Sequence, residues 1–456
     1  MPIDEPILLR LRYLGQPMAT LAHNPREQSY ALQFTEEFLQ TGHDLSPVQL
    51  PVARAGSTLQ LFGPGSTPLH AGLPGLIADA LPDAWGERML KHELPELRTT
   101  MGKLAALGQR ASGAITFEPV LGQGGDETVL RVSLAAIARE ADAFRAEPVS
   151  LDRNAVNIAL AHAGGTLGGA FPKLSAYLPL APEGTALSLH ELLVGGAPPP
   201  NHQPVILKLE RLGDETEGAV EFAFWRMAKR AGLRVPPAWL VEDEGRRHFA
   251  TARFDRIKSA QGDWSRLHVH SLSGLLHKEA ANGKIGYEEL IRLARALGGV
   301  PEAHEAFRRI LFNLLATNRD DHGRNHAFLY FDQLKTWQLS PAYDLNPNVC
   351  NTFIALNWLG DMRLPRRFDD VLRLAEVAGL GKSAVREMFS EIESATVGAW
   401  ETEAVNAGVS DVSRKVWGHE IQYQTAELRA DFRATGLPRS PRSLHPDQSK
   451  GDGKRA

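Results

Sequence analysis

The stretch "ATNRDDHGRNHAFLYF", residues 316–331, decides how this chain folds and what it does. Its nine central positions hold two carboxylates, two imidazoles, two guanidiniums and two carboxamides, with apolar runs on either side. The preceding run, "AFRRILFNLLATN", has apolar residues at helical spacing and ends in residues that favour a helix stop. We therefore expect the polar cluster on a loop that follows a buried helix.

The segments after the cluster bring a further carboxylate back to it. "HAFLYFD" and "TWQLSPAYD" predict two strands joined at "DQLK", and the second runs into Asp344. Asp320, Asn325 and Asp344 then converge, on spacings of five and nineteen. This is the spacing of a protein-kinase catalytic loop and its metal-binding Asp. It predicts Asp320 as the base for a hydroxyl, Asn325 and Asp344 as magnesium ligands, and Arg324 as a group that stabilises charge on the transferring phosphoryl.

Candidates for the nucleotide site lie upstream. "AGGTLGGAFPK", residues 163–173, carries two glycine pairs, which let backbone amides approach phosphate, although it is not a Walker A loop. Lys208 lies inside the apolar run "PVILKLE" and needs a partner for its ammonium group. Glu221, in the helical run that follows, is the expected partner. These features occur in the order that the kinase fold uses.

The rest of the chain predicts a strand-rich front half and a helix-rich back half. A helix is expected near "DAWGERMLKHEL", and amphipathic helices follow beyond Tyr287. The prolines between residues 174 and 204 predict a surface loop there. The tail is basic and poor in large apolar groups, so we expect it to be disordered.

Composition and sequence features argue against several classes of protein. The net charge of -4 argues against wholesale nucleic-acid binding, and no apolar run approaches the length of a membrane helix. The single cysteine, Cys350, cannot form an internal disulfide, and the acidic start lacks the features of a signal peptide. We therefore expect a cytoplasmic protein with no membrane contact.

With these residues in place, the chain resembles the HipA family of serine/threonine kinase toxins of bacterial toxin-antitoxin pairs. The sequences that carry the resemblance are "LPDAWGERML", "GGTLGGAFPK", "VILKLE", "ARFDR", "NRDDHGRNHAFL" and "LSPAYDL". It implies an α+β, bilobal kinase-like fold that uses ATP and magnesium. The expected parts are an N-terminal subdomain at 1–110, an N-lobe at 111–257, a helical C-lobe at 258–432 and a disordered tail at 433–456.

The resemblance also implies roles for individual residues. Lys208 would bind nucleotide phosphate with Glu221 as its partner, and Phe254 would line the adenine pocket. The remaining nucleotide-binding candidates belong to the Gly-rich segment: Thr166, Gly168, Gly169 and Lys173. Thr166 occupies the position of the hydroxyl that such kinases phosphorylate on themselves. The implied partners are a HipB-type DNA-binding antitoxin, through which the chain would reach DNA indirectly, and a protein substrate such as an aminoacyl-tRNA synthetase.

Two other functions remain open at this point. In a metal-dependent hydrolase, Asp320, His322, His326 and Asp344 would gather a transition metal, because imidazole ligands favour zinc or iron. In a non-catalytic scaffold, the chain would bind nucleotide, antitoxin and operator without transferring phosphate.

Overall fold

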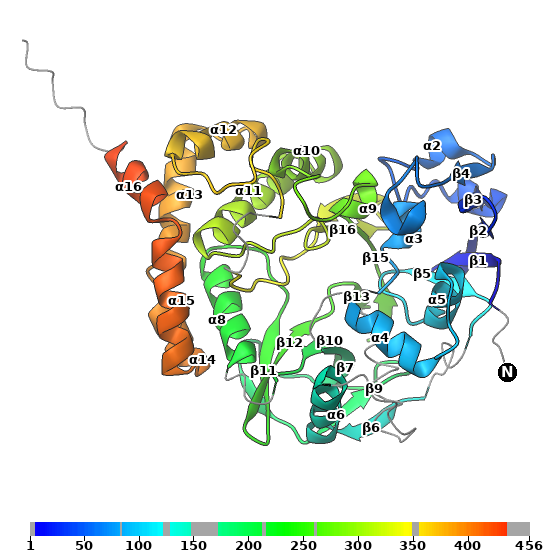
Figure 1. Cartoon of the computed structure of the whole chain (residues 1–456), viewed down its shortest axis with the longest axis horizontal. Helices are drawn as coiled ribbons and strands as arrows, with labels where there is room; N and C mark the ends of the chain where they lie inside the picture. Colours follow the sequence, from blue (N-terminus) through cyan, green and yellow to red (C-terminus); the bar gives the residue numbers. More distant parts are fainter. Residues whose placement is uncertain are drawn as a thin grey trace, which may run out of the picture.

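The computed structural model describes residues 5–82, 84–121, 128–146, 172–211, 216–259, 262–348 and 355–435. Three parts are visible in Figure 1: a small sheet with short helices, a seven-stranded sheet, and a helical lobe beside it. The last two form the two lobes, and the small sheet lies on the side opposite the C-terminal helices of residues 400–434. This confirms the α+β, bilobal fold with a β-rich N-terminal subdomain that the sequence predicts.

The N-terminal subdomain contains a five-stranded antiparallel sheet in the order β4-β3-β2-β1-β5. Its inner face is apolar because side chains alternate along each strand, so that Leu9 and Leu11 are buried while Leu8 and Arg10 are exposed. Short helices fill the segment between β3 and β5. The elements are β1 (Leu8–Tyr13), β2 (Gln16–Asn24), β3 (Ser29–Phe34), α1 (Glu36–Thr41), α2 (Val52–Ala55), β4 (Gln60–Phe62), α3 (Gly75–Ala78), α4 (Ala84–Glu93), α5 (Thr100–Leu107) and β5 (Ile115–Glu118).

The seven-stranded sheet has the order β6-β9-β7-β10-β12-β11-β8, with helices α6 and α8 on opposite faces. Leu207 and Ala250 belong to the core cluster shared with α6, and Phe249 to the cluster shared with α8. The elements are β6 (Leu130–Ser133), α6 (Leu134–Ala146), β7 (Lys173–Pro179), β8 (Ala186–Ser188), β9 (Glu191–Val194), β10 (His202–Lys208), α8 (Glu217–Arg230), β11 (Ala238–Asp243) and β12 (Arg246–Ala252).

The prediction of a surface loop between residues 174 and 204 is wrong. Three strands, β7, β8 and β9, lie in this segment, and β7 pairs with β10 over seven residues. Pro182 and the run 198–200 lie between strands, while Pro179 ends β7. Prolines in such positions leave the ladder hydrogen bonds intact, so they mark turns between short strands and not the absence of a sheet.

The C-terminal lobe is helical around a small antiparallel sheet, β15-β16-β17. The predicted hairpin is confirmed: β16 pairs with β17, with Phe328 opposite Leu339. The elements are β13 (Arg256–Lys258), β14 (Trp264–Arg266), β15 (His268–Ser271), α9 (Leu272–Leu276), α10 (Tyr287–Gly298), α11 (Val300–Leu315), β16 (Ala327–Phe331), β17 (Thr336–Leu339), α12 (Phe368–Ala378), α13 (Lys382–Ala395), α14 (Trp400–Ala407), α15 (Asp411–Tyr423) and α16 (Ala426–Ala434). The predicted tail lies almost wholly outside the described residues.

The N-terminal subdomain is joined to the helical lobe through β15. The buried His268 ring donates from Nε2 to the Leu45 carbonyl over 2.9 Å, and His270 hydrogen-bonds to Ser46 Oγ over 3.1 Å. Burial lowers the pKa of His268 to about 3, with the neighbouring His270 acting in the same direction. A neutral imidazole is therefore part of the contact between the two units.

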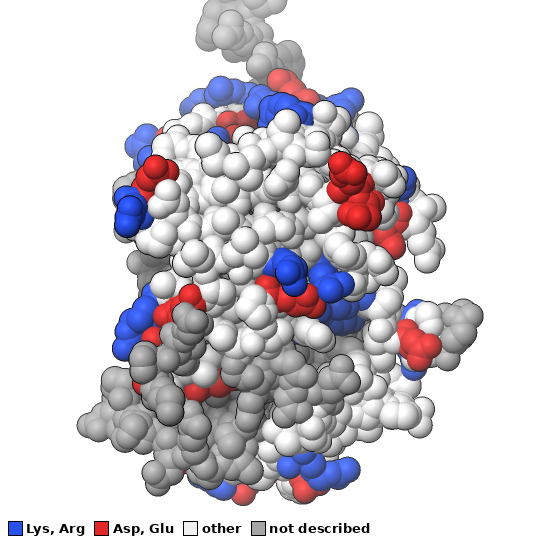
Figure 2. Space-filling model, turned by 90° about the vertical axis from the view of Figure 1, so that its right-hand side faces the viewer, with Lys and Arg blue, Asp and Glu red and all other residues white. Residues whose placement is uncertain are grey.

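The surface of the N-terminal side carries its charges in small groups of mixed sign. Figure 2 shows Lys and Arg side chains beside Asp and Glu, with wide areas of uncharged residues between them. Among the described residues, no helix has the length and apolar character needed to cross a membrane.

The buried imidazole of His268 generates a prediction about pH. His268 has a pKa near 6.5 in the unfolded chain and about 3 in the folded chain. The contribution of the neutral imidazole to the unfolding free energy is therefore complete above pH 6.5 and is lost as the pH falls toward 3. His268→Gln keeps a donor for the Leu45 carbonyl and removes the titration. Between pH 7 and pH 5 the wild type should lose about 2 kcal/mol more unfolding free energy than the variant. Urea denaturation at several pH values measures this, and parallel stability curves would contradict it.

Candidate active site

The polar cluster forms a short loop between the buried helix α11 and strand β16, as predicted. Backbone hydrogen bonds curl it: the Asp320 carbonyl accepts from the His322 amide over 2.9 Å, and the His322 carbonyl from the Asn325 amide over 2.8 Å. Asn325 Nδ2 also donates to the Asp320 carbonyl over 2.9 Å. The spacing of five therefore places the Asn325 side chain directly against the backbone of Asp320.

The two adjacent carboxylates of the loop have different environments. Asp320 is exposed, whereas Asp321 is buried and accepts from Tyr287 Oη over 3.0 Å and pairs with His326 Nε2 over 2.8 Å. Burial opposes the ionisation of Asp321, but His326 and the hydrogen bonds outweigh it and lower its pKa. Asp321 thus anchors the loop, while Asp320 is left free to meet solvent or a ligand.

The environment of Asp320 favours a basic carboxylate. Partial burial raises its pKa, the nearby Asp344 and Asp321 raise it further, and His322 acts in the opposite direction. A carboxylate of raised pKa holds a proton more strongly, as a general base requires.

The β16–β17 hairpin returns the chain to this loop, and Asp344 follows it. Asn318 Nδ2 donates to the Asp344 carbonyl over 3.4 Å, which ties the two loops together. The backbone of Asp344 has φ 56°, in the left-handed region that a non-glycine residue enters only at an energetic cost. Such strained residues concentrate at functional sites, where the surrounding structure holds them in place.

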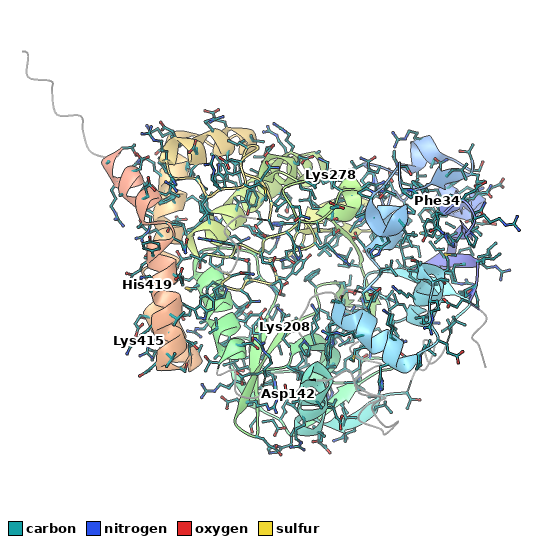
Figure 3. All side chains as sticks on the ribbon, viewed as in Figure 1. Phe34, Asp142, Lys208, Lys278, Lys415 and His419 are labelled. Carbon is teal, nitrogen blue, oxygen red and sulfur yellow. The ribbon has the colours of Figure 1, made fainter. Side chains whose placement is uncertain are left out.

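Lys208 connects the two lobes at this point. Its Nζ donates to Glu221 Oε1 on α8 and, over 2.5 Å, to Asp344 Oδ1 on the hairpin loop. The exposed fraction of the side chain is 16% for Lys208, 9% for Glu221 and 33% for Asp344. Figure 3 shows Lys208 near the middle of the molecule, where the seven-stranded sheet meets the helical lobe. The predicted pair of Lys208 and Glu221 is present. Asp344, the predicted metal ligand, also accepts a hydrogen bond from Lys208.

The charges of this group are mutually dependent. Burial alone would lower the pKa of Lys208, but Asp344 and Glu221 raise it well above its ordinary value. Burial likewise opposes the charge of Asp344, yet Lys208 and Lys173 hold its pKa far below the ordinary value. Lys173 is the cross-strand partner of Lys208, so two ammonium groups approach the same carboxylate. Glu221 keeps a raised pKa because burial is its largest influence.

Phe254 lies where the sheet passes into the helical lobe. Its ring is 5.2 Å from that of Tyr343, the residue before Asp344, and Tyr343 Oη donates to the Arg324 carbonyl over 2.6 Å. Phe254 is therefore beside the site, as an adenine-pocket residue should be. Its contact with a nucleotide stays a prediction.

The side chain of Arg324 points to a different place from the one expected. Its Nη2 donates to the Leu81 carbonyl of the N-terminal subdomain over 3.0 Å. The sequence placed this guanidinium at the transferring phosphoryl group, and that role remains a prediction for which the described contacts give no support.

The remaining candidates divide between described and undescribed residues. Thr166, Gly168 and Gly169 lie outside the described residues, so the structure says nothing of the Gly-rich loop. Sequence reasoning gave no role to three polar residues that build the site. They are Asn318 and Tyr343, whose contacts are given above, and Asn346, which hydrogen-bonds Glu221. Their sequence signal is nearness to the predicted ligands: Asn318 and Tyr343 lie within the quoted stretches "NRDDHGRNHAFL" and "LSPAYDL", and Asn346 lies two residues after Asp344.

The geometry removes His326 from the ligands that the metal-dependent hydrolase interpretation requires. His326 is fully buried and is committed to Asp321. Within the ranges that the structure describes, no group of three or more His, Cys, Asp and Glu side chains is arranged to hold a metal ion.

Comparison with known protein families agrees with this geometry. Residues 165–400, more than half of the chain, match the HipA-like C-terminal domain, and residues 9–118 match the HipA N-terminal domain. The chain belongs to the HipA family. The HipA C-terminal match contains every candidate site residue named above.

Relatives of this HipA chain share modest identity with it. "Putative kinase Y4mE" of Sinorhizobium fredii is 27% identical over 202 residues, which cover 41% of this chain and 46% of that protein. "Putative kinase" of Haemophilus influenzae is 29% identical over 207 residues, which cover 38% and 59%. The chain therefore spans about half the length of the curated relatives that it matches.

A solved structure shares the HipA fold over almost the whole chain. It is a chain of the Shewanella oneidensis MR-1 complex of the toxin-antitoxin proteins HipA and HipB with operator DNA. The TM-score is 0.66 at 17% identity, and the match covers 93% of this chain and 97% of that one. At this identity the likeness establishes the fold.

The shared ammonium group predicts the effect of removing Lys208. Lys208→Met leaves Glu221 and Asp344 without their shared cation and should lower the unfolding free energy by about 2–3 kcal/mol, less than for a fully buried pair because Asp344 is one-third exposed. Adding Glu221→Gln removes one of the two carboxylates that shared this cation and should recover about 1 kcal/mol. Urea denaturation of both variants checks this. Equal stability of the single and double variants would show that the carboxylates are not coupled through Lys208.

Proposed function

We propose that this HipA-family chain is an ATP- and magnesium-dependent serine/threonine protein kinase that acts as the toxin of a toxin-antitoxin pair. The observation that carries the proposal is the group formed by Lys208, Glu221 and Asp344, with Asp320 exposed on the adjoining loop. In protein kinases a strand lysine paired with a helix glutamate, together with a metal-binding Asp, positions the nucleotide phosphates, and this group has the same three members.

The donor groups suit magnesium. Asn325 uses Nδ2 on the Asp320 carbonyl, which leaves its Oδ1 as the atom available to a metal. Asp344 is kept ionised and partly exposed, so that the pair offers the hard oxygen ligands that Mg²⁺ prefers. When bound, the metal would neutralise charge on the phosphate oxygens.

Two further groups would act on the reactants. Lys208 has three protons, of which Glu221 and Asp344 receive two, and the third is available to a phosphate oxygen. Asp320 is exposed with a raised pKa, so it can orient a serine or threonine hydroxyl and accept its proton. Self-phosphorylation of Thr166 remains a prediction, because this residue is outside the described part of the chain.

The proposed partners follow from family membership and from the solved complex with HipB and operator DNA. We expect a HipB-type antitoxin to bind this chain and to bring it to DNA. The proposed substrate is a translation protein such as an aminoacyl-tRNA synthetase. The cytoplasmic location expected from the sequence stays a prediction.

Replacement of either acidic residue should abolish phosphate transfer. Asp320→Asn removes the base and should reduce transfer from γ-labelled ATP by about 10²–10⁴-fold. Asp344→Asn removes a metal ligand and should give a comparable loss of phosphate transfer. Transfer to casein and to the chain itself provides the measurement. Asp369→Asn, on an exposed turn of α12, is the matched control and should behave as wild type.

The outcomes separate the competing functions. Transfer by the wild type that persists in both acidic variants would refute the assignment of the site. A wild type that binds ATP but transfers nothing would favour the scaffold. Tightly held zinc in the purified protein would favour the hydrolase.

A further inference from the structure

We propose that Arg324 is a positioning residue through which the N-terminal subdomain holds the catalytic loop, residues 320–325, in its working shape. The proposal rests on the proposed function, because the loop has a working shape only if phosphate is transferred there. It differs from the expected role of Arg324 at the phosphoryl group, since the guanidinium bonds to a backbone carbonyl of another subdomain.

The first step is the direct contact between the N-terminal subdomain and α9. Helix α3 lies against α9 so closely that a Cβ on Gly75 would overlap the carbonyl group of Gly274. Figure 1 shows the two short helices side by side. Only glycine permits this backbone approach, so the two elements are packed as one unit.

Asp79, which follows α3, fastens this contact. Its carboxylate accepts from the Ser271 amide, from Ser271 Oγ and from the His270 ring, each over 2.6 Å. Ser271 in turn caps the N-terminus of α9 through the Gly274 amide. Burial opposes the charge of Asp79, but His270, Arg324 and Ser271 together lower its pKa to about 2. The carboxylate is therefore a fixed negative charge, and it interacts electrostatically with Arg324 of the catalytic loop.

The second step is the contact between α9 and the catalytic loop. The Leu272 amide donates to the His326 carbonyl over 2.8 Å, and the Ser273 amide to the Gly323 carbonyl over 3.1 Å. The Gly323 amide donates to the Ala280 carbonyl over 2.7 Å. The backbone of the loop thus rests on the element that Asp79 holds.

Arg324 closes the connection from the other side. Its guanidinium donates to the Leu81 carbonyl, two residues after Asp79, and its own carbonyl accepts from Tyr343 beside Asp344. One residue therefore joins the N-terminal subdomain, the catalytic loop and the metal-binding loop. His70 lies within electrostatic range of Arg324 and of Lys103 and Glu87, which pair with each other.

The connection matters because the reacting groups need an accurate placement. Asp320 and Asn325 are fixed mainly by hydrogen bonds within their own loop, so a tilt of that loop would move both together. A displacement of about 1 Å in a catalytic group can cost about 100-fold in rate. Loss of Arg324 should therefore lower kcat while leaving the nucleotide contacts of Lys208 and Glu221 in place.

The test compares the full chain with Arg324→Ala, Arg324→Lys and the control Arg373→Ala, which removes an exposed arginine of α12. We expect kcat for transfer from ATP to casein to fall about 10–100-fold in Arg324→Ala. The dissociation constant for ADP with magnesium should stay within about twofold. Arg324→Lys can still reach the Leu81 carbonyl with one donor, so it should be intermediate.

Hydrogen exchange gives a readout that does not depend on activity. Amides of residues 320–325 should exchange at least about tenfold faster in Arg324→Ala than in wild type, while those of α11 stay protected. Unchanged exchange with a large loss of kcat would overturn the proposal, since it would place Arg324 at the phosphoryl group. Unchanged exchange with unchanged kcat would also overturn it. If the wild type transfers no phosphate, the proposed function fails, and faster loop exchange would still establish the physical link.

Discussion

The ammonium group of Lys208 is the interaction on which the site depends. It is held between Glu221 of α8 and Asp344 of the hairpin loop, and these carboxylates belong to different lobes. A largely buried ammonium and two largely desolvated carboxylates are each unfavourable alone, so they stabilise one another only when the lobes meet in this arrangement. The position of the two lobes relative to each other and the charge balance of the site therefore depend on the same interaction. Lys173, opposite Lys208 on β7, adds positive charge at the same place.

The catalytic loop meets a second constraint, which is to present a carboxylate to solvent from a rigid position. Two adjacent acidic residues divide these roles, because Asp321 is buried against Tyr287 and His326 while Asp320 is exposed. This division of roles explains why so many polar residues occur together in the catalytic loop. Each buried polar group requires a partner, and the partners come from the same short stretch or from elements packed around it.

Sequence reasoning succeeded where a pattern determines the structure. The apolar periodicity of α11, the hairpin that follows it and the strand–helix unit of Lys208 and Glu221 all have strong local signals, and together they fix the order of the site. The short strands β8 and β9 were missed because prolines interrupt the segment around them and because they pair with strands far away in the chain, β8 with β11 and β9 with β6. The different environments of Asp320 and Asp321 were also not separable, since burial depends on Tyr287, which is far away in sequence.

Arg324 shows where motif spacing stops being informative. Spacing places the backbone of a residue, and for a short side chain such as Asp or Asn this nearly fixes the functional atoms. A guanidinium lies at the end of a long chain and can reach partners in several directions. Here its acceptor, the Leu81 carbonyl, comes from a subdomain that kinase motifs do not describe. An N-terminal subdomain that touches the catalytic loop can restrain that loop, so this part of the chain contributes to the arrangement of the site as well as to the bulk of the molecule.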